Sequence, residues 1–350
     1  MKKQTVMVLF GGRSPEHGIS LQSAATVLEN LDTEKYRPVA VGITREGRWY
    51  RFTGSWDAIR EDRWSQGACT PAILSPDRGD RGLLLLEESG FRRLPVDVAL
   101  PMLHGCLGED GTVQGLIQLA GIPLAGCGVL ASALGMDKEM ARKAAAAAGV
   151  AVPRCHTLGR EEAASQAPAL ARRLGYPVFV KPARAGSSLG VRRVEEEGQL
   201  APALEDALRY DSRVLLEEAV PGFEVGCAIA GTGVLTLGAV DEIHLAGGLL
   251  DHGEKYHPVT SVTRAPARLP EEVTARIKET AVAVYRALDC AGFARVDLFL
   301  TPDQRVLFHE VNTIPGFTPH SRYPAMMAAA GISIPEVLDL VISSATEGGE

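Results

Sequence analysis

The amino-acid sequence predicts an α/β fold divided into more than one domain, and three observations support this prediction. The chain has 350 residues, of which 46% are hydrophobic and 23% charged, enough for two or three packed domains. Short apolar runs alternate with helical patterns through the first third, as expected of a parallel sheet covered by helices. From about Leu130 the pattern changes to paired strands between long helices, which predicts a second kind of domain.

The first domain is predicted over residues 1–128. Its strands are expected at residues 5–10, 38–44 and 96–103. An amphipathic helix is expected from Ser20, after the first strand. Residues 45–95 are rich in Arg, Asp, Gly and Trp, and we expect a hairpin or loop insertion there.

Two further domains are predicted over residues 129–212 and 213–350. Residues 131–149 have the composition of one strong helix, which Gly149 ends. The remaining strands are expected at residues 177–183, 189–194, 213–219, 224–231 and 234–245 and in a hairpin at 293–312. Helices are expected at residues 195–210 and 270–289, with two more closing the chain. Residues 244–262 are too polar and too broken by Gly for a core, and we expect a lid-like segment there.

Charge and cysteine usage exclude several classes of protein. The net charge of −7 argues against a general nucleic-acid-binding surface. Six cysteines occur without CxxC or zinc-finger spacing, which indicates reduced thiols in a cytoplasmic protein. The apolar run at residues 5–10 is shorter than that of a secretory signal, and no segment approaches the ~18 apolar residues of a membrane span. We therefore expect a cytoplasmic protein that binds neither nucleic acid nor membranes.

The hairpin at 293–312 has the most informative geometry. Side chains alternate along a strand, so Arg295 and Asp297 share one face, and Glu310 and Asn312 share one face of the partner strand. If the turn at 301–304 has two or four residues, all four side chains fall on the same side. A three-residue loop would separate them.

Asp297, Glu310 and Asn312 would then form an all-oxygen ligand set suited to Mg²⁺. The same alternation predicts that Phe308 shares their face and that His309 points the other way. The alternative is a solvent-facing sheet whose wet side happens to carry charged residues.

Two loops have features of a nucleotide site. Residues 180–191 place Lys181 at a strand end before a Gly- and Ser-rich turn, which can cradle phosphates or can simply be a flexible hairpin tip with a surface lysine. Residues 215–224 place Glu217 and Glu224 around a Pro-Gly turn. That turn could serve adenine and ribose, although alone it is a weak signal.

Polar residues also follow the predicted strands of the first domain. Glu16 lies after the first strand, where it could bind a ligand or stabilise the helix N-terminus. His104 and Glu109 could pair in a site or could simply occupy a turn. Together, the metal set, the phosphate loop, the hinge and the lid suit transfer of the γ-phosphate of ATP to a molecule held by the first domain.

Eight motifs in register resemble the D-alanine-D-alanine ligases of the ATP-grasp superfamily over nearly the whole chain. They are LFGGRSPEHGISLQSA, LHGCLGEDGTVQG, AGCGVLASALGMDK, FVKPARAGSSLGV, EVGCA, DHGEKY, ARVDLF and EVNTIPGFTPHSRYPAM. The resemblance implies an ATP-grasp fold with an N-terminal Rossmann-like parallel-sheet domain. It also implies ATP between the central and C-terminal domains, and a cytoplasmic homodimer joined through the N-terminal domain.

The resemblance further implies roles for individual residues. ATP would be bound by Lys138, Lys181, Ser188, Glu217, Glu218, Val220 and Glu224, with the lysines on the phosphates and Glu217 and Glu224 at the adenine and ribose. Two Mg²⁺ ions, or Mn²⁺, would be bound by Asp297, Glu310 and Asn312. The first D-alanine would be held by Glu16, Ser187 and Tyr256, with His104 also in the substrate site. Lys255 would reach the γ-phosphate, Arg295 and the backbone of Gly316 would stabilise the oxyanion, and Ser321 would bind the second carboxylate.

The implied function is ligation of D-alanine to D-alanine through D-alanyl phosphate, for peptidoglycan precursors. Several motif details are more similar to the D-alanine-D-serine ligases of the glycopeptide-resistance branch, so D-serine is the alternative acceptor. The lid has His252 where the ligases commonly carry tyrosine, but its Lys255-Tyr256 pair favours an amine acceptor over D-lactate. A ligase for another carboxylate and amine is a rival that the EHGIS and HSRYP loops disfavour. A non-catalytic ATP-grasp-like binding protein is more remote, because it would be expected to lose the metal set or Lys181.

Overall fold

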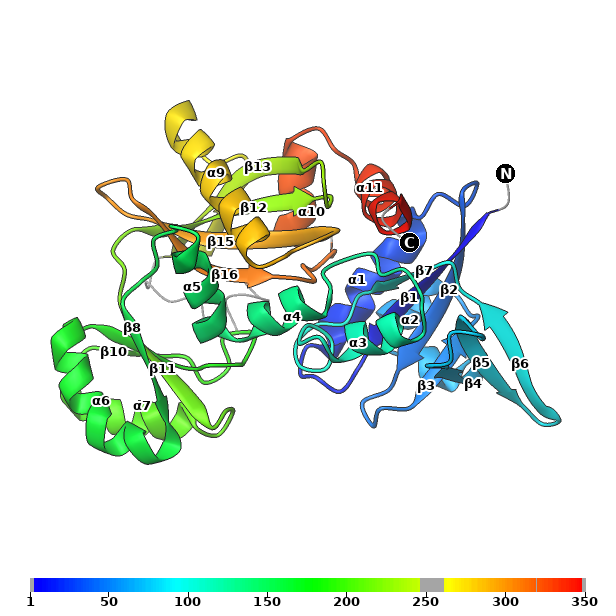
Figure 1. Cartoon of the computed structure of the whole chain (residues 1–350), viewed down its shortest axis with the longest axis horizontal. Coiled ribbons are helices and arrows are strands. Elements are labelled where there is room, and N and C mark those ends of the chain that lie inside the picture. Colours follow the sequence, from blue (N-terminus) through cyan, green and yellow to red (C-terminus); the bar gives the residue numbers. More distant parts are fainter. Residues whose placement is uncertain (1–2, 246–260, 319, 348–350) are drawn as a thin grey trace.

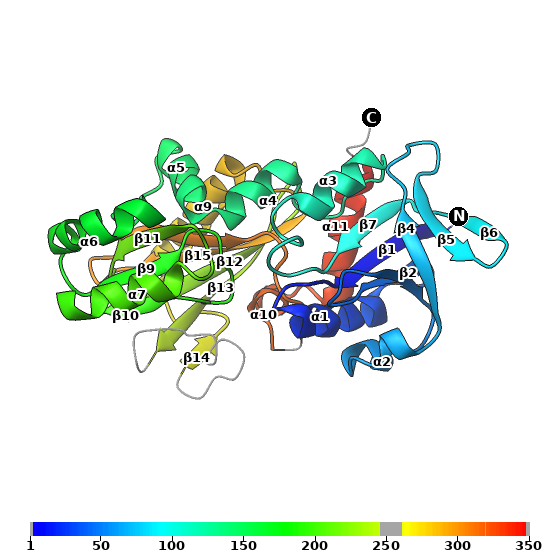
Figure 2. The ribbon, with the colours of Figure 1, turned by 90° about the horizontal axis from the view of Figure 1, so that it is seen from below.

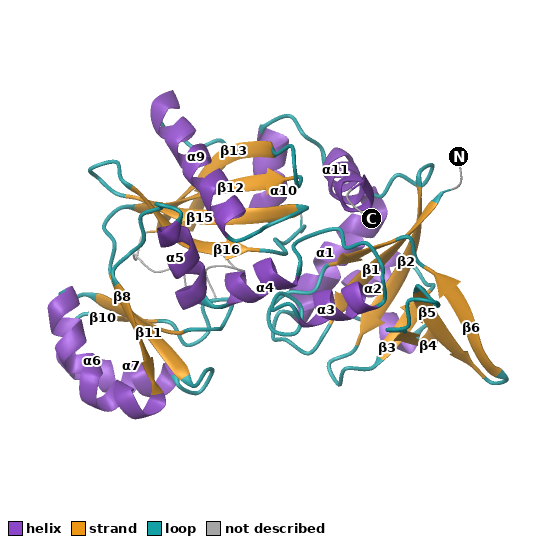
Figure 3. Ribbon diagram, viewed as in Figure 1, coloured by secondary structure: helices purple, strands orange, loops and turns teal. Residues whose placement is uncertain are grey.

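The computed structural model describes residues 3–245, 261–318 and 320–347, and these residues form three sheets (Figures 1 and 3). The sheets follow one another along the chain and have seven, four and five strands. Each has its own covering helices, and the predicted α/β class is confirmed.

The seven-stranded sheet has the order β6-β5-β4-β3-β2-β1-β7. Its strands are β1 (Gln4–Gly11), β2 (Tyr36–Ile43), β3 (Trp49–Phe52), β4 (Cys69–Leu74), β5 (Gly82–Glu87), β6 (Gly90–Pro95) and β7 (Val98–Pro101). Only β1, β2 and β7 are parallel, and residues 49–95 add an antiparallel meander, so the predicted insertion extends the sheet. The helices of this part are α1 (His17–Asn30), α2 (Trp56–Arg60) and α3 (Thr112–Leu119).

The four-stranded sheet is antiparallel, in the order β10-β9-β11-β8. Its strands are β8 (Cys155–Gly159), β9 (Val178–Pro182), β10 (Arg192–Val194) and β11 (Arg213–Glu218). Helices α6 (Arg160–Leu174) and α7 (Leu200–Ala207) cover one face, where an apolar cluster including Leu158, Ala171 and Val180 is buried (Figure 1). The predicted boundary at 212/213 would separate β11 from the sheet with which it pairs.

The five-stranded sheet is also antiparallel, in the order β14-β13-β12-β15-β16. Its strands are β12 (Phe223–Ala230), β13 (Thr236–Leu245), β14 (Ser261–Arg264), β15 (Phe293–Leu300) and β16 (Val306–Asn312). Helix α9 (Glu271–Ala287) packs on one face, and α10 (Arg322–Ala329) and α11 (Ile334–Glu347) close the chain.

The single helix predicted over residues 131–149 is wrong, because two helices occur there, α4 (Val129–Met136) and α5 (Lys138–Ala147). Asp137 interrupts the pattern: its backbone is extended, and its side chain accepts a hydrogen bond from the Met140 amide at 3.2 Å. The apolar side of α5 packs into the core of the five-stranded sheet through Ala141 and Ala145. Figures 1 and 2 both place α3 and α4 between the first sheet and the rest of the molecule.

No single helix among the described residues is long and apolar enough to cross a membrane, although α10 and α11, bent by 102° at their junction, together meet the length and composition criterion.

Candidate active site

A cleft lies where the three sheets meet, and most of the predicted site residues line it. Its walls come from β9 and β11 on one side and from β12, β15 and β16 on the other, while the loop before α1 and the loop after β7 contribute from the first domain. The predicted residues in the lining are Glu16, Lys138, Lys181, Ser187, Ser188, Glu217, Val220, Glu224, Glu310 and Asn312. Segments far apart in the sequence therefore meet in one site.

The β15–β16 hairpin places Arg295 directly opposite Asn312 and Asp297 directly opposite Glu310. This pairing confirms that the four side chains share one face. The predicted reason is wrong, however, because the connection spans residues 301–305, which is five residues and not two or four. That odd length alone would put Glu310 on the opposite face from Asp297.

A β-bulge restores the shared face. The pairing shifts by one residue between Asp297 and Leu298, so His309 is the extra residue beside Glu310, opposite Asp297. Phe308 consequently turns into the core, where it is 0% exposed, and His309 lines the cleft together with Glu310. The predictions that Phe308 shares the face of Glu310 and that His309 points away are both wrong.

Asp297, Glu310 and Asn312 supply two carboxylates and an amide, a donor set that fits Mg²⁺. Arg295 donates to Asp297 from Nε at 2.8 Å and from Nη2 at 2.7 Å. Burial opposes ionisation of Asp297, but the charges of Arg295 and Arg322 outweigh burial and lower the pKa of this carboxyl, so it stays anionic. The described residues hold no group of three His, Cys, Asp or Glu arranged for a metal, so the amide of Asn312 is needed to complete the set.

The phosphate loop between β9 and β10 turns sharply and is contacted by Lys138 of α5. Ser187 and Ser188 both have left-handed backbones, with φ of 50° and 55°, which turns the chain sharply at the cleft. Lys138 donates from Nζ to the Ala185 carbonyl at 2.6 Å and from its backbone amide to the Ala183 carbonyl at 3.1 Å. Lys138 therefore lies at the phosphate loop, and its predicted contact with the ATP phosphates stays a prediction.

Lys181 of β9 and Glu217 of β11 are diagonal neighbours on adjacent strands, since Lys181 is paired with Leu215. Lys181 Nζ donates to Glu217 Oε1 at 2.9 Å, and Glu217 is also ion-paired with Arg142 of α5. Burial opposes ionisation of Glu217, but the charges of Arg142 and Lys181 outweigh it and lower the pKa of this carboxyl to about 2. Glu217 is 1% exposed and has two cations beside it, so its carboxylate holds Lys181 in place. It also lines the cleft, and its predicted contact with the nucleoside stays a prediction.

Glu218 does not fit its predicted role in ATP binding through its side chain. Its carboxylate accepts hydrogen bonds from the Arg154 backbone amide at 2.8 Å and from Arg154 Nε at 2.6 Å. These contacts lie outside the cleft lining, whereas Val220 and Glu224 lie within it.

The amino-acid end of the site joins the first domain to the phosphate loop. The Ser187 hydroxyl donates a hydrogen bond to the Glu16 carboxylate. Because Glu16 precedes α1 and Ser187 follows β9, this contact connects the two parts of the chain that were predicted to hold the first substrate and the ATP phosphates.

One alternative predicted from the sequence was that His104 and Glu109 pair in a site. Both instead contact the backbone of Ile314. His104 Nδ1 lies 3.0 Å from the Ile314 carbonyl oxygen, and the Ile314 amide donates to Glu109 Oε1 at 3.3 Å. Burial lowers the pKa of His104, so its ring is neutral near pH 7. His104 is thus placed to position the loop that follows β16, and it lies outside the lining of the main cleft.

That loop brings Gly316 and Ser321 together. A Cβ atom on Gly316 would lie 2.8 Å from the Ser321 hydroxyl, so a side chain at this position would crowd that hydroxyl. The Ser321 hydroxyl accepts a hydrogen bond from the Thr318 amide at 3.0 Å. The predicted carboxylate-binding serine and oxyanion-binding backbone therefore lie side by side.

Comparison with known proteins agrees with this geometry. Residues 5–127 match a family model described as "D-ala D-ala ligase N-terminus", and residues 145–343 match "D-ala D-ala ligase C-terminus". The chain belongs to the D-alanine-D-alanine ligase family. The ATP-grasp fold and the ligase class expected from the motifs are thereby confirmed.

Individual relatives of this ligase have names that differ in the second substrate. A putative D-alanine-D-lactate ligase of Streptomyces coelicolor is 48% identical over 99% of both chains. A D-alanine-D-alanine ligase of Caldicellulosiruptor bescii is 40% identical over 99% of this chain and 96% of its own. The crystal structure of the VanG D-Ala:D-Ser ligase from Enterococcus faecalis has a TM-score of 0.91 and 45% identity, covering 98% of this chain and 99% of its own.

Two charged residues of the ligase were missed from the sequence. Arg322, at the start of α10, forms a bidentate pair with the fully buried Asp241 at 2.7 and 2.8 Å, and its Nη1 lies 3.2 Å from Asp297 Oδ1. Burial opposes the charge of Arg322, but the carboxylates around it outweigh burial and raise its pKa. The only available signals were an acidic residue inside the apolar run of β13 and an arginine within HSRYP.

His309 lines the cleft, although the sequence predicted that it points away. Its Nε2 lies 3.3 Å from Glu224 Oε1, and its ring lies 4.4 Å from that of Phe299, centre to centre. Burial lowers the pKa of His309 to about 4. A neutral ring therefore lies against the wall of the cleft between Glu224 and Glu310. The predicted lid residues Lys255 and Tyr256 lie outside the described residues.

Proposed function

We propose that this ligase uses ATP to join D-alanine to a second D-alanine, with ADP and phosphate as the other products. The observation that supports this most directly is the hydrogen bond from Ser187 to Glu16. It links a carboxylate suited to an ammonium group with a loop suited to phosphates, in the cleft that also contains Lys138 and Lys181. An amino acid held at Glu16 would therefore have its own carboxylate directed to the γ-phosphate.

The chemistry needs two steps, because a carboxylate is a poor electrophile. In the first, a carboxylate oxygen of the first D-alanine attacks the γ-phosphorus and ADP leaves, giving D-alanyl phosphate. In the second, the amine of the second substrate attacks the acyl carbon and phosphate leaves. Lys138 and Lys181 would stabilise charge on the phosphate oxygens, and Arg295 with the Gly316 amide would stabilise the oxyanion. Ser321 would bind the carboxylate of the second substrate.

Asp297, Glu310 and Asn312 would hold magnesium, which supplies charge neutralisation and orientation of the phosphate oxygens when bound. We propose two ions, with Mn²⁺ as a substitute. The cross-strand pair of Asp297 and Glu310 and the anionic state of Asp297 support this assignment.

The second substrate has three candidates among the relatives. D-Alanine is the proposed acceptor, and D-serine is the alternative favoured by the likeness to the D-Ala:D-Ser ligase. D-Lactate is the third candidate, because the 48% identical relative is named a putative D-alanine-D-lactate ligase. The Lys255-Tyr256 pair in this sequence supports an amine acceptor instead. Discrimination by one hydroxyl amounts to only ~10²-fold in a pocket that merely tolerates it.

Phosphate release from ATP tests the proposal, with D-alanine, D-serine and D-lactate supplied singly and in pairs, and with product masses recorded. We expect release that depends on D-alanine and a product of two D-alanines. No D-alanine-dependent release would refute the ligase assignment, and a predominant D-alanyl-D-serine or D-alanyl-D-lactate product would replace the proposed acceptor.

Three wider features are proposed with this function. The chain is divided at about residue 128 and again after β11, because a boundary at 212 would separate β11 from the sheet with which it pairs. Residues 244–262, most of which lie outside the described residues, would exclude water so that it does not hydrolyse the acyl phosphate. Two copies form a homodimer through the N-terminal domain. The reaction takes place in the cytoplasm, where ATP and unpolymerised D-amino acids are available. Sedimentation and limited proteolysis with and without ATP test the first two features.

A further inference from the structure

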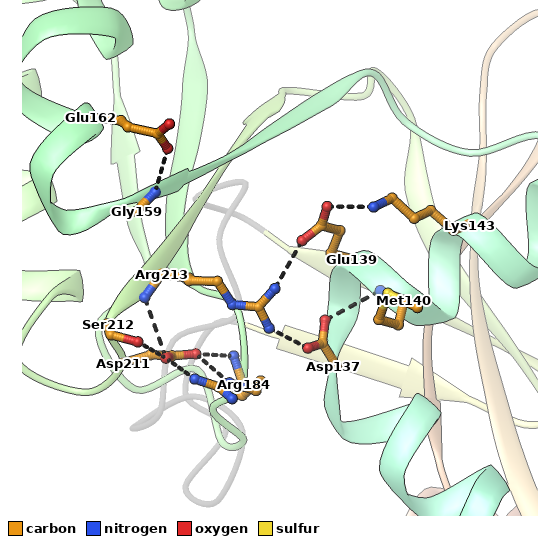
Figure 4. Close-up of polar contacts among 10 residues, drawn as sticks. All are labelled: Asp137, Glu139, Met140, Lys143, Gly159, Glu162, Arg184, Asp211, Ser212 and Arg213. Carbon is orange, nitrogen blue, oxygen red and sulfur yellow. Dashed lines mark hydrogen bonds and ion pairs between the residues drawn. The ribbon is translucent and has the colours of Figure 1, made fainter.

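Helix α5 lies between the two walls of the cleft and contacts them in different ways. Its apolar side, with Ala141 and Ala145, is part of the core under the five-stranded sheet. Its charged side faces the four-stranded sheet, where Arg213 of β11 is ion-paired with Asp137 and Glu139 (Figure 4). The helix also carries Lys138, whose side chain holds the phosphate loop.

One residue of α5 reaches deeper than the others. Arg142 is 3% exposed and is ion-paired with Glu217, whose other oxygen accepts the hydrogen bond from Lys181. Cys155 is directly opposite Glu217 in the β8–β11 pairing. A carboxylate thus lies between two cations, so the three charges together are +1.

Replacing Arg142 by an uncharged residue would change this charge balance. Of the buried trio of Arg142, Glu217 and Lys181, only the Glu217 carboxylate and the Lys181 ammonium would then remain, and their charges would cancel. A neutral pair attracts a polyphosphate less than a group with net positive charge, and the difference is large where water is scarce. Arg142 is too deeply buried to serve as a surface contact.

We propose that Arg142 is a positioning residue for ATP: it offsets the charge of Glu217, so that Lys181 keeps a net positive charge for the phosphates. The proposal rests on the proposed function only in taking ATP as the substrate. In this proposal, Glu217 orients Lys181 through their hydrogen bond. The positive charge of Arg142 then offsets the negative charge of Glu217, which would otherwise cancel that of Lys181.

The competing explanation is that Arg142 merely ties α5 to the four-stranded sheet. Arg213 provides a matched control, because it links the same helix to the same strand through Asp137 and Glu139 but is not part of the buried trio. Its side chain is 32% exposed, and its partners lie at the start of the helix. Arg213→Met removes a tether and leaves the charges around Lys181 unchanged.

Nucleotide affinity of the whole chain is measured without any amino acid, by displacement of a fluorescent ATP analogue with ATP and, separately, with adenosine. For Arg142→Met we expect ATP to bind at least ~10-fold more weakly while adenosine, which has no phosphates, changes by less than ~2-fold. Arg142→Lys keeps the charge and should restore ATP affinity to within ~3-fold of the original. Arg213→Met should leave the ratio of ATP to adenosine affinity unchanged.

Three outcomes would overturn the proposal: unchanged ATP affinity in Arg142→Met, equal weakening of ATP and adenosine, or an equal effect of Arg213→Met. If Arg142→Met does not fold, Arg142→Gln gives the same comparison, with circular dichroism as the check on folding. Steady-state rates add a second readout, in which KM for ATP rises and KM for D-alanine does not. Because binding is measured without an acceptor, a wrong acceptor assignment would leave this test intact.

Discussion

Replacing Phe308 by alanine should weaken the fold and leave the nucleotide site nearly unchanged. Phe308 is 0% exposed and packs with Leu298 and Val311 in the cluster beneath α9. Removing a buried phenylalanine side chain costs about 3–5 kcal/mol, from lost transfer free energy and the cavity left behind. Since 1 kcal/mol shifts the unfolding temperature by about 2–4 °C in domains of 150–250 residues, we expect a drop of at least about 6 °C.

The measurement is thermal unfolding by circular dichroism, together with the affinity for ATP at a temperature where both proteins are folded. His309→Ala is the matched control, because His309 is the neighbouring residue but lines the cleft. We expect its unfolding temperature to fall by less and its ATP affinity to change by more. If Phe308→Ala instead lowered ATP affinity with little loss of stability, Phe308 would face the cleft and the β-bulge at His309 would be refuted.

Three other predictions follow from the site. Glu310→Ala should abolish Mg²⁺-dependent phosphate release with an unchanged circular dichroism spectrum, and full activity would refute the metal assignment. Ser187→Ala removes a hydrogen bond to the charged Glu16, worth about 1.5–3 kcal/mol, so KM for D-alanine should rise at least ~10-fold and KM for ATP less than ~2-fold. Glu217 has its pKa lowered from 4.5 to about 2, so its stabilising effect is complete above pH 4.5 and is lost as the pH falls toward 2. The unfolding temperature of Glu217→Gln should therefore be lower at neutral pH and should fall less steeply below pH 4.5; an equally steep fall would contradict the assigned ion pairs.

Local sequence was enough for most strands and for the composition of the site. The apolar runs at 177–183 and 293–300 became β9 and β15 because their residues favour extended, buried backbone. It was not enough for residues 131–149, where the helix-forming alanines concealed a break. Asp137 decides that break, because its side chain caps α5 and competes with a continuous helix.

The hairpin 293–312 separates the two kinds of information most clearly. Alternation along each strand is local, so the sequence alone put Arg295 with Asp297 and Glu310 with Asn312. The register between strands is set by the turn and by bulges, which depend on both strands at once, so only the tertiary structure decided it. The sequence predicted that His309 points away from the site, whereas the bulge places it in the lining of the cleft.

The sequence by itself determined the fold class and the candidate oxygen ligands and lysines, because residue type fixes which chemistry a side chain can perform. Only the tertiary structure decided which charges meet. Arg142 and Glu217 are 75 residues apart (217 − 142), and both are buried. Asp241 and Arg322 are 81 residues apart; Asp241 is buried, and the side chain of Arg322 is 14% exposed. A buried charge is stable only beside a partner, and the chain brings those partners together through sheet pairing and helix packing, which the one-dimensional pattern does not contain.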